Sequence, residues 1–271
     1  MKKLSIISVT YNDLDNLKRT VESVIDQFES DIEYIIIDGA STDGTVDYLK
    51  TLENNDIKII SEPDKGIYNA MNKGIKKAFG EWILFLNAGD VLLPNVLSKL
   101  LPLLNDDKGC LYGDIFLTLS YKDKQFYKLE QADDEINIGI LKKHMQFSHQ
   151  AFFCKKEILV ALKGFDEQFK TAADWDLMIR IALGLYRFEH INVPIAIYDK
   201  TGVSSKPHPN EKHNVRKKNK LYRGLDTQYI TDLLQAGYWY IVALFLRENK
   251  VKYQIKYRKY TDEIIYKEYE K

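Results

Sequence analysis

The chain has 271 residues, 45% of them hydrophobic, and is long enough to bury a sizeable core as one large or two small domains. Its 39 Lys and Arg residues balance its 39 Asp and Glu residues, so net charge attracts no nucleic acid and we expect none as a partner. From residue 206 to the end, however, fifteen basic residues face eight acidic ones, a net charge of +7 against −7 on residues 1–205. This asymmetry predicts a distinct basic C-terminal part.

The cysteines and the amino terminus indicate a reducing compartment. Cys110 and Cys154 lie far apart in sequence and in no metal-like spacing, so we expect neither a disulfide framework nor a zinc site. The apolar stretch in "MKKLSIISVTYND" is shorter than the roughly 7–15 residues of a secretory signal, so it predicts a first strand. We therefore expect a cytoplasmic protein.

Strands and helices alternate in the first third of the chain. Strand-like runs begin at Leu4, Glu33, Ile57 and Glu81. Apolar residues at helical spacing follow the first three runs, around 14–28, 46–49 and 67–79. This alternation predicts an α/β fold with a mostly parallel central sheet covered on both faces.

After Pro94 the alternation weakens. Strand-like pieces at 110–119, 124–130 and 149–155 predict a mixed or antiparallel extension, and a helix is expected at 174–183. A cluster of Ser, Lys, Pro and His near 204–209 indicates a boundary. We therefore predict two domains, a first one at 1–205, with halves 1–94 and 95–205, and a basic helical extension at 206–271.

Acidic residues follow all four N-terminal strands, at the sheet edge where open parallel sheets bind ligands. The polar stretches are Thr10–Asp13, Asp38–Ser41, Glu62–Gly66 and Asn87–Asp90. Each stretch alone has a structural alternative: Asp13 could simply cap a helix, and Asp43-Gly44 could simply form a turn. Four acidic stretches at one edge, however, repel one another unless a cation or a donor-rich ligand offsets them.

Two common phosphate-binding motifs are absent from the sequence. It has no GxxxxGK[ST] and no GxGxxG after the first strand. A divalent cation held by Asp90 could bind phosphate instead, because Mg²⁺ or Mn²⁺ usually takes one or two protein carboxylates and completes its shell with substrate phosphates and water.

Five stretches, in order, resemble the motifs of family-2 inverting glycosyltransferases of GT-A fold. They are "SVTYND" (8–13), "DGASTDGT" (38–45), "SEPDKGIYNAMNKGI" (61–75), "FLNAGD" (85–90) and "GFDEQFKTAADWDLMIRI" (164–181). The resemblance implies a GT-A, Rossmann-like nucleotide-sugar-binding domain with a helical C-terminal extension. It also implies a UDP-sugar donor.

The resemblance assigns the donor-binding residues by position. Thr10 and Tyr11 would line the base pocket, and Asp38 would accept a hydrogen bond from the uracil ring. The residues around the ribose and diphosphate would be Asp13, Asp64, Lys65 and Asn72. The chemistry agrees, because uracil N3–H needs an acceptor and a lysine is a point charge suited to phosphate, although Lys65 could also be a solvated side chain beside a turn.

The metal motif departs from the family pattern. Members usually carry Asp-x-Asp-Asp after the fourth strand, whereas here Asn87 and Gly89 replace the first two acids and Asp90 remains. The resemblance still implies a Mn²⁺ or Mg²⁺ ion, with Asp90 as its protein carboxylate. Asn87 could hydrogen-bond a ribose hydroxyl.

The resemblance maps the catalytic base to Asp174. Helical spacing places Asp174 on an apolar face, whereas Asp176 lies about 200° away and should pair with Arg180. A structural alternative for Asp174 is an acid favoured by the helix dipole. Ala173 stands where the family has Glu.

The acceptor side is less clearly patterned. His149 and Gln150 match positions near the acceptor or donor sugar, although a lone His is more often structural. Trp175 could offer its ring to a sugar or pack in the core.

The C-terminal extension combines basic and apolar stretches. "KHNVRKKNKLYR" (212–223) carries six Lys or Arg, and "YWYIVALFL" (238–246) is far shorter than the roughly 20 residues that span a bilayer. The segment 212–246 could form a peripheral contact with the inner face of a membrane. We favour packing on the catalytic domain or on a second subunit, as in a homodimer.

These observations predict a cytoplasmic glycosyltransferase that moves a hexosyl or N-acetylhexosaminyl group from a UDP-sugar to a glycan hydroxyl, with inversion. A bacterial surface polysaccharide or lipopolysaccharide, carried on lipid or not, is the expected product class. A non-catalytic nucleotide-sugar-binding subunit is the alternative. A sugar nucleotidyltransferase is less favoured, because "TYNDLDNL" has no Gly, Lys or Arg after the first strand.

Overall fold

The structure is a computed structural model that describes residues 2–52, 56–105, 109–121, 124–198 and 208–245. For residues 119–121, 124–126 and 239–245 only the backbone is described. The predicted boundary between 205 and 206 lies outside these ranges, as do residues 246–271. The side chains of the apolar run after Tyr238 are likewise outside the description.

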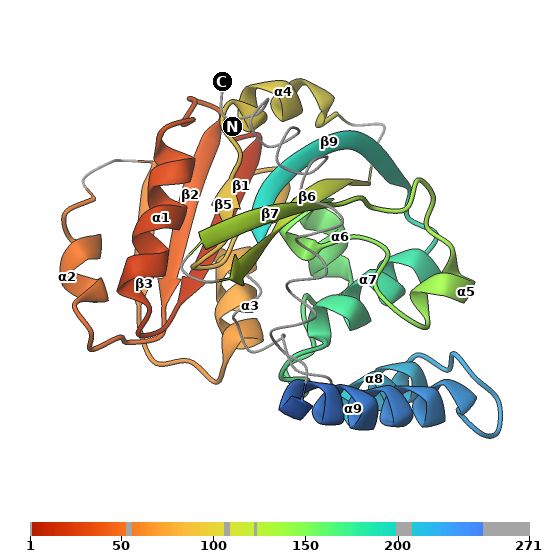
Figure 1. The fold of residues 1–271 in the computed structure, drawn as a ribbon. Coiled ribbons are helices and arrows are strands. Elements are labelled where there is room, and N and C mark those ends of the chain that lie inside the picture. The colour runs from red at the N-terminus through yellow and green to blue at the C-terminus, as the bar shows by residue number, and fades with distance from the viewer. Residues whose placement is uncertain (1, 53–55, 106–108, 122–123, 199–207, 246–271) are drawn as a thin grey trace.

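Among the described residues a nine-stranded sheet runs in the order β3-β2-β1-β4-β8-β6-β9-β5, with β7 paired to β6 (Figure 1). Four neighbouring strands are parallel: β1 (Leu4–Thr10), β2 (Ile32–Asp38), β3 (Ile57–Ser61) and β4 (Trp82–Phe85). The register sets Thr10 opposite Asp38 and Asp38 opposite Ser61. The predicted α/β fold with its mostly parallel central sheet is therefore confirmed.

The remaining strands form the mixed extension that the sequence predicts. They are β5 (Val91–Leu92), β6 (Cys110–Tyr121), β7 (Lys124–Glu130), β8 (Phe152–Lys155) and β9 (Phe188–Tyr198). β8 runs antiparallel to β4 and β6, whereas β9 is parallel to β6. Sequence patterning did not predict β9, which carries Pro194 at an irregularity in its pairing with β6, a position where a strand tolerates proline.

Helices cover both faces of the sheet (Figure 1). One face carries α1 (Leu14–Ile25), α2 (Thr45–Leu49) and α4 (Val96–Leu100), and the other carries α3 (Ile67–Lys77), α6 (Lys156–Ala161) and α7 (Ala173–Leu183). Short helical turns lie at η1 (Leu101–Leu103), α5 (Ile138–Leu141) and η2 (His149–Ala151). Each face of the sheet has its own hydrophobic core. In β1, Leu4 and Ile6 pack in the core on the α1 face, and Ile7 and Val9 pack in the core on the α3 face.

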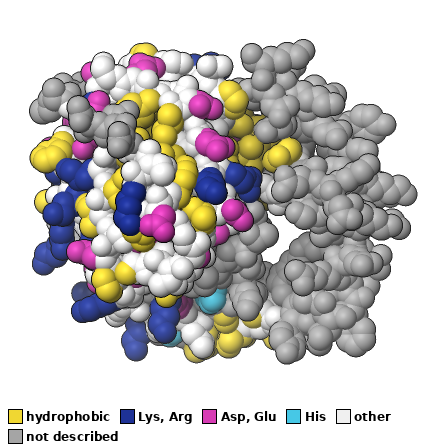
Figure 2. All heavy atoms as spheres, turned by 90° about the vertical axis from the view of Figure 1, so that its left-hand side faces the viewer, with side chains coloured by type: hydrophobic (Ala, Val, Ile, Leu, Met, Phe, Trp, Pro, Cys, Tyr) yellow, Lys and Arg dark blue, Asp and Glu magenta, His cyan; other side chains and the backbone are white. Residues whose placement is uncertain are grey.

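The molecular surface at the α1 and α2 side of the sheet mixes acidic, basic and apolar side chains, with basic ones gathered toward the lower left (Figure 2). Near the opposite end lie α8 (Pro209–Lys218) and α9 (Thr227–Phe245), next to α7 (Figure 1). Val215 of α8 is fully buried in the core that contains α7. The described part of the extension is thus helical, and α8 packs against the core that contains α7. No helix in the described ranges has both the length and the apolar character needed to cross a bilayer.

The two cysteines lie opposite each other on β6 and β8, although they are distant in sequence. Their sulfur atoms are 3.6 Å apart, and both are free thiols in the buried core. Burial raises the pKa of Cys154 well above its usual value, helped by the neighbouring Cys110 thiol. Both side chains therefore act as small apolar core residues.

Candidate active site

The polar stretches that follow β1 to β4 meet at one edge of the sheet. We call residues 10–13, 38–45, 61–66 and 87–90 the strand-end edge. Asp38, fully buried at the end of β2, accepts hydrogen bonds from the Ser41 hydroxyl at 2.5 Å and the Ser61 hydroxyl at 2.6 Å. Thr10 Oγ1, in the neighbouring strand, is buried and has no hydrogen-bond partner among the described residues. A buried polar atom of this kind indicates a place for a ligand atom or water.

Tyr11, Gly39 and Asp64 lie against one another. A Cβ on Gly39 would come within 2.7 Å of Asp64 Oδ2 and 3.1 Å of the Tyr11 ring, so only glycine permits this approach. Tyr11 is 65% exposed, which leaves its ring available for stacking. The edge therefore presents an aromatic face beside a carboxylate.

The other donor-side residues also flank this edge. Asp13 accepts a hydrogen bond from the Asn16 side chain at 2.9 Å and makes no side-chain cap to α1. Lys65 is exposed, and its backbone N–H donates to Asn69. Its side chain is thus exposed to solvent, in the residue that follows Asp64.

The turn at 87–90 is fixed by Thr20 of α1. The Thr20 hydroxyl donates to the Asp90 carbonyl at 2.7 Å and accepts from Gly89 N–H at 3.0 Å. Gly89 has φ +97°, a left-handed conformation that favours glycine. Asp90 is 4% exposed, and its Oδ2 accepts the N–H of Asn87 at 3.2 Å. Sequence reasoning missed Thr20, because this residue lies 70 positions before Asp90.

The residues at this turn fit a cation that is shared with substrate. No group of three or more His, Cys, Asp or Glu side chains in the described ranges could enclose a metal. Asn87 Oδ1, however, is buried without a hydrogen-bond partner there, and the Asp90 carboxylate accepts the backbone N–H of Asn87 in the same turn. Hard oxygen ligands of this kind suit Mg²⁺ or Mn²⁺, with the rest of the shell from phosphate and water.

Asp174, at the start of α7, lies at this site. Its Oδ1 accepts hydrogen bonds from the Tyr68 hydroxyl at 3.2 Å and the Trp175 N–H at 2.8 Å. Its Oδ2 is 3.3 Å from His149 Nδ1. The Asp174 side chain is 14% exposed, so it retains access to a ligand.

His149 links Asp174 to the turn at 87–90. Its Nε2 lies 3.3 Å from the Asn87 amide nitrogen, on the opposite side of the ring from Asp174. Burial disfavours the charged imidazolium, but the hydrogen bond and charge of Asp174, with the charge of Asp90, outweigh it and raise the pKa of His149. The next residue, Gln150, is buried and reaches Asp90 Oδ1 at 3.5 Å.

Two expected site residues are engaged within the protein. The Asn72 amide binds both backbone groups of Phe165 at 2.9 Å and also the Glu167 carboxylate, so it does not point to a ribose or diphosphate. Trp175 is 3% exposed and donates its indole N–H to the Leu141 carbonyl at 2.7 Å, so its ring packs in the core rather than facing a sugar. The predicted pair of Asp176 and Arg180 is confirmed at 2.7 Å.

Tyr68 is a functional candidate that sequence reasoning missed. It lies in the quoted stretch at 61–75, on α3, and its hydroxyl contacts Asp174 across a sequence separation of 106 residues. Burial raises the pKa of Tyr68 well above its usual value, and the Asp174 charge adds to this. The phenol therefore stays protonated and acts as a hydrogen-bond donor to that carboxylate.

The chain matches known proteins along most of its length. The family model described as glycosyl transferase family 2 matches residues 5–166. An uncharacterized glycosyltransferase of Mycobacterium tuberculosis is 32% identical over 211 residues, which covers 76% of this chain and 78% of that protein. A PGL/p-HBAD biosynthesis glycosyltransferase of Mycobacterium bovis is 28% identical over 65% of this chain and 68% of its own.

Solved structures share the fold. TarS of S. aureus in complex with UDP-GlcNAc aligns with a TM-score of 0.63 at 17% identity, over 86% of this chain and 71% of TarS. The mannosyltransferase PcManGT of Pyrobaculum calidifontis, in complex with GDP-Man and Mn²⁺, aligns with a TM-score of 0.60 at 17% identity, over 92% and 71%. The family match, the ordered strand ends and the GT-A-like fold together establish that this chain belongs to glycosyl transferase family 2.

Proposed function

We propose that this glycosyltransferase moves a sugar from a UDP-sugar to a hydroxyl group of a glycan acceptor, with inversion at the anomeric carbon. Asp174 is the proposed general base. The observation that carries this proposal is the contact of His149 with Asp174 on one side and Asn87 on the other, because it joins the proposed base to the turn that bears Asp90. A base and a diphosphate-binding turn must face the same substrate for transfer to occur.

In the proposed reaction, Asp174 takes the proton of the acceptor hydroxyl while that oxygen bonds to the anomeric carbon and the bond to the diphosphate breaks. Tyr68 and the Trp175 N–H hold one oxygen of Asp174, which orients the other oxygen toward His149 and the ligand. His149 and Gln150 are proposed to lie beside the acceptor or the donor sugar.

The donor is proposed to bind along the strand-end edge, with Thr10, Tyr11 and Asp38 at the base and Asp13, Asp64 and Lys65 at the ribose and diphosphate. TarS binds UDP-GlcNAc and PcManGT binds GDP-Man, so the fold accepts both nucleotide classes. We favour UDP because uracil N3–H needs an acceptor such as Asp38. This contact requires that the Ser41 or Ser61 hydroxyl give up its bond to that carboxylate.

Asp90, with Asn87 Oδ1, is the proposed protein contribution to a bound Mn²⁺ or Mg²⁺. When bound, such an ion stabilises negative charge on the departing diphosphate. PcManGT was solved with Mn²⁺. The group transferred is proposed to be a hexosyl or N-acetylhexosaminyl unit and the product a bacterial surface glycan, in line with the relative named for PGL/p-HBAD biosynthesis.

We propose that the protein works in the cytoplasm.

One face of α9 carries exposed apolar side chains, namely Ile230, Leu233, Leu234 and Tyr238. This face supports a contact of the 212–246 segment with a partner outside the domain. A peripheral membrane contact predicts flotation with anionic vesicles. A homodimer predicts a doubled mass in sedimentation without lipid.

The test of this function compares wild-type protein with Asp174→Asn in the presence of Mn²⁺ and a panel of UDP-sugars. We expect wild-type protein to release UDP from at least one donor, and Asp174→Asn to be slower by about 100-fold to 10,000-fold, the usual contribution of a general base. UDP affinity, measured by calorimetry, should be retained in the variant. Equal rates in the two proteins would contradict the role of Asp174, and a protein that binds UDP without turning over any donor would be a non-catalytic binding subunit.

A further inference from the structure

We propose that Lys218, at the end of α8, is a positioning residue for Asp174. In this proposal the C-terminal extension holds the segment 164–176 in the conformation that presents the base. The inference rests on the proposed function for the role of Asp174, whereas the contacts themselves are independent of it.

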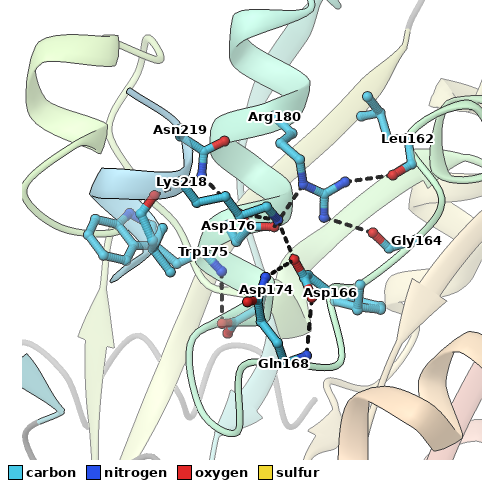
Figure 3. Close-up of polar contacts among 12 residues, drawn as sticks. Leu162, Gly164, Asp166, Gln168, Asp174, Trp175, Asp176, Arg180, Lys218 and Asn219 are labelled. Atoms are coloured by element: carbon cyan, nitrogen blue, oxygen red, sulfur yellow. Dashed lines mark hydrogen bonds and ion pairs between the residues drawn. The ribbon is translucent and has the colours of Figure 1, made fainter. Parts of the chain in front are cut away.

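The centre of the arrangement is Asp176, two residues after the proposed base. It is fully buried, and its carboxylate is bound by Arg180 at 2.7 Å, Lys218 at 2.9 Å and Asn219 at 2.8 Å (Figure 3). A buried carboxylate is strongly unfavourable unless it is paired and hydrogen-bonded. The first turn of α7 is therefore fixed by partners from α8 as well as by its own arginine.

Lys218 also reaches the loop that precedes α7. Its Nζ lies 2.6 Å from the carboxylate of Asp166. Arg180 extends the same connection, because its guanidinium donates to the carbonyls of Leu162 and Gly164 at 2.7 Å each (Figure 3). Burial would raise the pKa of Asp166, but hydrogen bonds from Lys218 and Gln168 outweigh it and lower that pKa. Loop and helix are thus joined through one lysine.

The first turn of α8 holds the middle of the same segment. The Glu211 carboxylate accepts hydrogen bonds from the backbone N–H groups of Lys170 and Thr171, both at 2.8 Å, and from the Thr171 hydroxyl at 2.7 Å. Within the segment, Glu211 therefore contacts residues 170–171, and Lys218 contacts residues 166 and 176, which lie before and after them.

On its other side the segment is bound by α3. Asn69 and Asn72 hold the Glu167 carboxylate at 2.9 Å each, and Asn72 also holds Phe165. The segment therefore lies between α3 and α8. Removing the contacts from α8 should leave it held from one side only.

The activity test uses full-length Lys218→Met, Lys218→Arg and the matched control Lys217→Met, since Lys217 contributes no side-chain bond to this arrangement. With the UDP-sugar that wild-type protein turns over, Lys218→Met should lower kcat by on the order of tenfold, because a misplacement of about 1 Å can cost roughly 100-fold. The donor KM and the affinity for UDP should not change. Lys218→Arg should restore most of kcat, and Lys217→Met should match wild type.

Hydrogen exchange separates this inference from the proposed function, because it needs no turnover. Amides in 164–177 should exchange at least tenfold faster in Lys218→Met than in Lys217→Met, with amides in β1 to β4 unchanged. If Lys218→Met does not fold, Asn219→Ala serves instead, since it removes one neutral partner of Asp176. Unchanged exchange in 164–177, or a loss of UDP affinity equal to the loss of kcat, would overturn the proposal.

Discussion

At the strand-end edge each polar stretch directly follows the strand that positions it, and the register of β1, β2 and β3 sets Thr10, Asp38 and Ser61 in one row. The segment 164–176 has no such frame. It is held by side chains from α3 and α8. Asn72 of α3 is 93 residues from its partner Phe165, and Lys218 of α8 is 42 residues from its partner Asp176. One part of the site is thus built by local sequence order, and the other by long-range contacts, so the two should respond differently to mutation.

The largest effect is expected for Arg216→Met. Arg216 is 2% exposed and binds Asp226 and Asp232 at 2.9 Å each, so it joins α8 to α9. Burial would raise the pKa of Asp226, but the hydrogen bonds from Arg216 and His213 outweigh it and lower that pKa. Losing the arginine removes the guanidinium from two buried carboxylates and leaves Asp226 with His213 and Asp232 with the neutral Gln228 amide. This loss should reduce the free energy of unfolding by about 3–5 kcal/mol.

Urea denaturation of Arg216→Met measures this loss, with the exposed Arg223→Met as the control. Because α8 supports the segment 164–176 and not the strand-end edge, calorimetry should find UDP affinity unchanged under folded conditions. A stability loss below about 1 kcal/mol, the size of an exposed ion pair, would show that the cluster does not hold the helices together.

A smaller effect is expected from a pair of glycines. Gly164 has φ +64°, and an added Cβ would lie 2.3 Å from Asn72 Oδ1, whereas Gly44, with φ +95°, would meet only Leu14 at 3.5 Å. Both Ala variants incur the cost of a left-handed residue, about 1–2 kcal/mol. Gly164→Ala should cost about 1–3 kcal/mol more, since it also disturbs the hydrogen bonds of Asn72. If urea denaturation gives the same loss of unfolding free energy for both variants, the segment 164–176 accommodates an added Cβ as readily as the turn at Gly44.

The smallest effect is expected at His149, which joins the two regions. Its pKa is raised in the folded protein, so the protonated form stabilises the fold fully below the ordinary pKa of about 6.5, and this stabilisation is lost as pH rises through the folded value. His149→Gln should therefore reduce Tm more at pH 6 than at pH 8, in metal-free buffer. The exposed His144→Gln should show no such difference, and a pH-independent loss in His149→Gln would contradict the contact with Asp174.

Sequence reasoning predicted the strand-end edge well, because each strand is rich in apolar residues and a polar stretch begins where the strand ends. It also separated Asp174 from Asp176 by helical spacing, and the pair with Arg180 is present. Hydrophobic periodicity could not reveal β9, where Pro194 and partly buried residues interrupt the pattern.

Residues that act through distant contacts were not predictable from their neighbours in the chain. Thr20 sits on an amphipathic helix as an ordinary polar residue, and Tyr68 looks like a core aromatic, yet they hold Asp90 and Asp174 respectively. The roles expected of Asn72 and Trp175 differ from their contacts for the same reason, because sequence position does not show what a side chain meets after folding.

In the proposed function, the strand-end edge binds a nucleoside diphosphate together with a cation held by Asp90. The most direct measurement is calorimetric titration of UDP into wild-type protein and Asp90→Ala, each with and without Mn²⁺, with GDP as the competing nucleotide. We predict that Mn²⁺ tightens UDP binding in wild type but not in Asp90→Ala, and that GDP binds more weakly than UDP. UDP binding that is equally tight without Mn²⁺, or no UDP binding under any of these conditions, would contradict this role of the strand-end edge and Asp90.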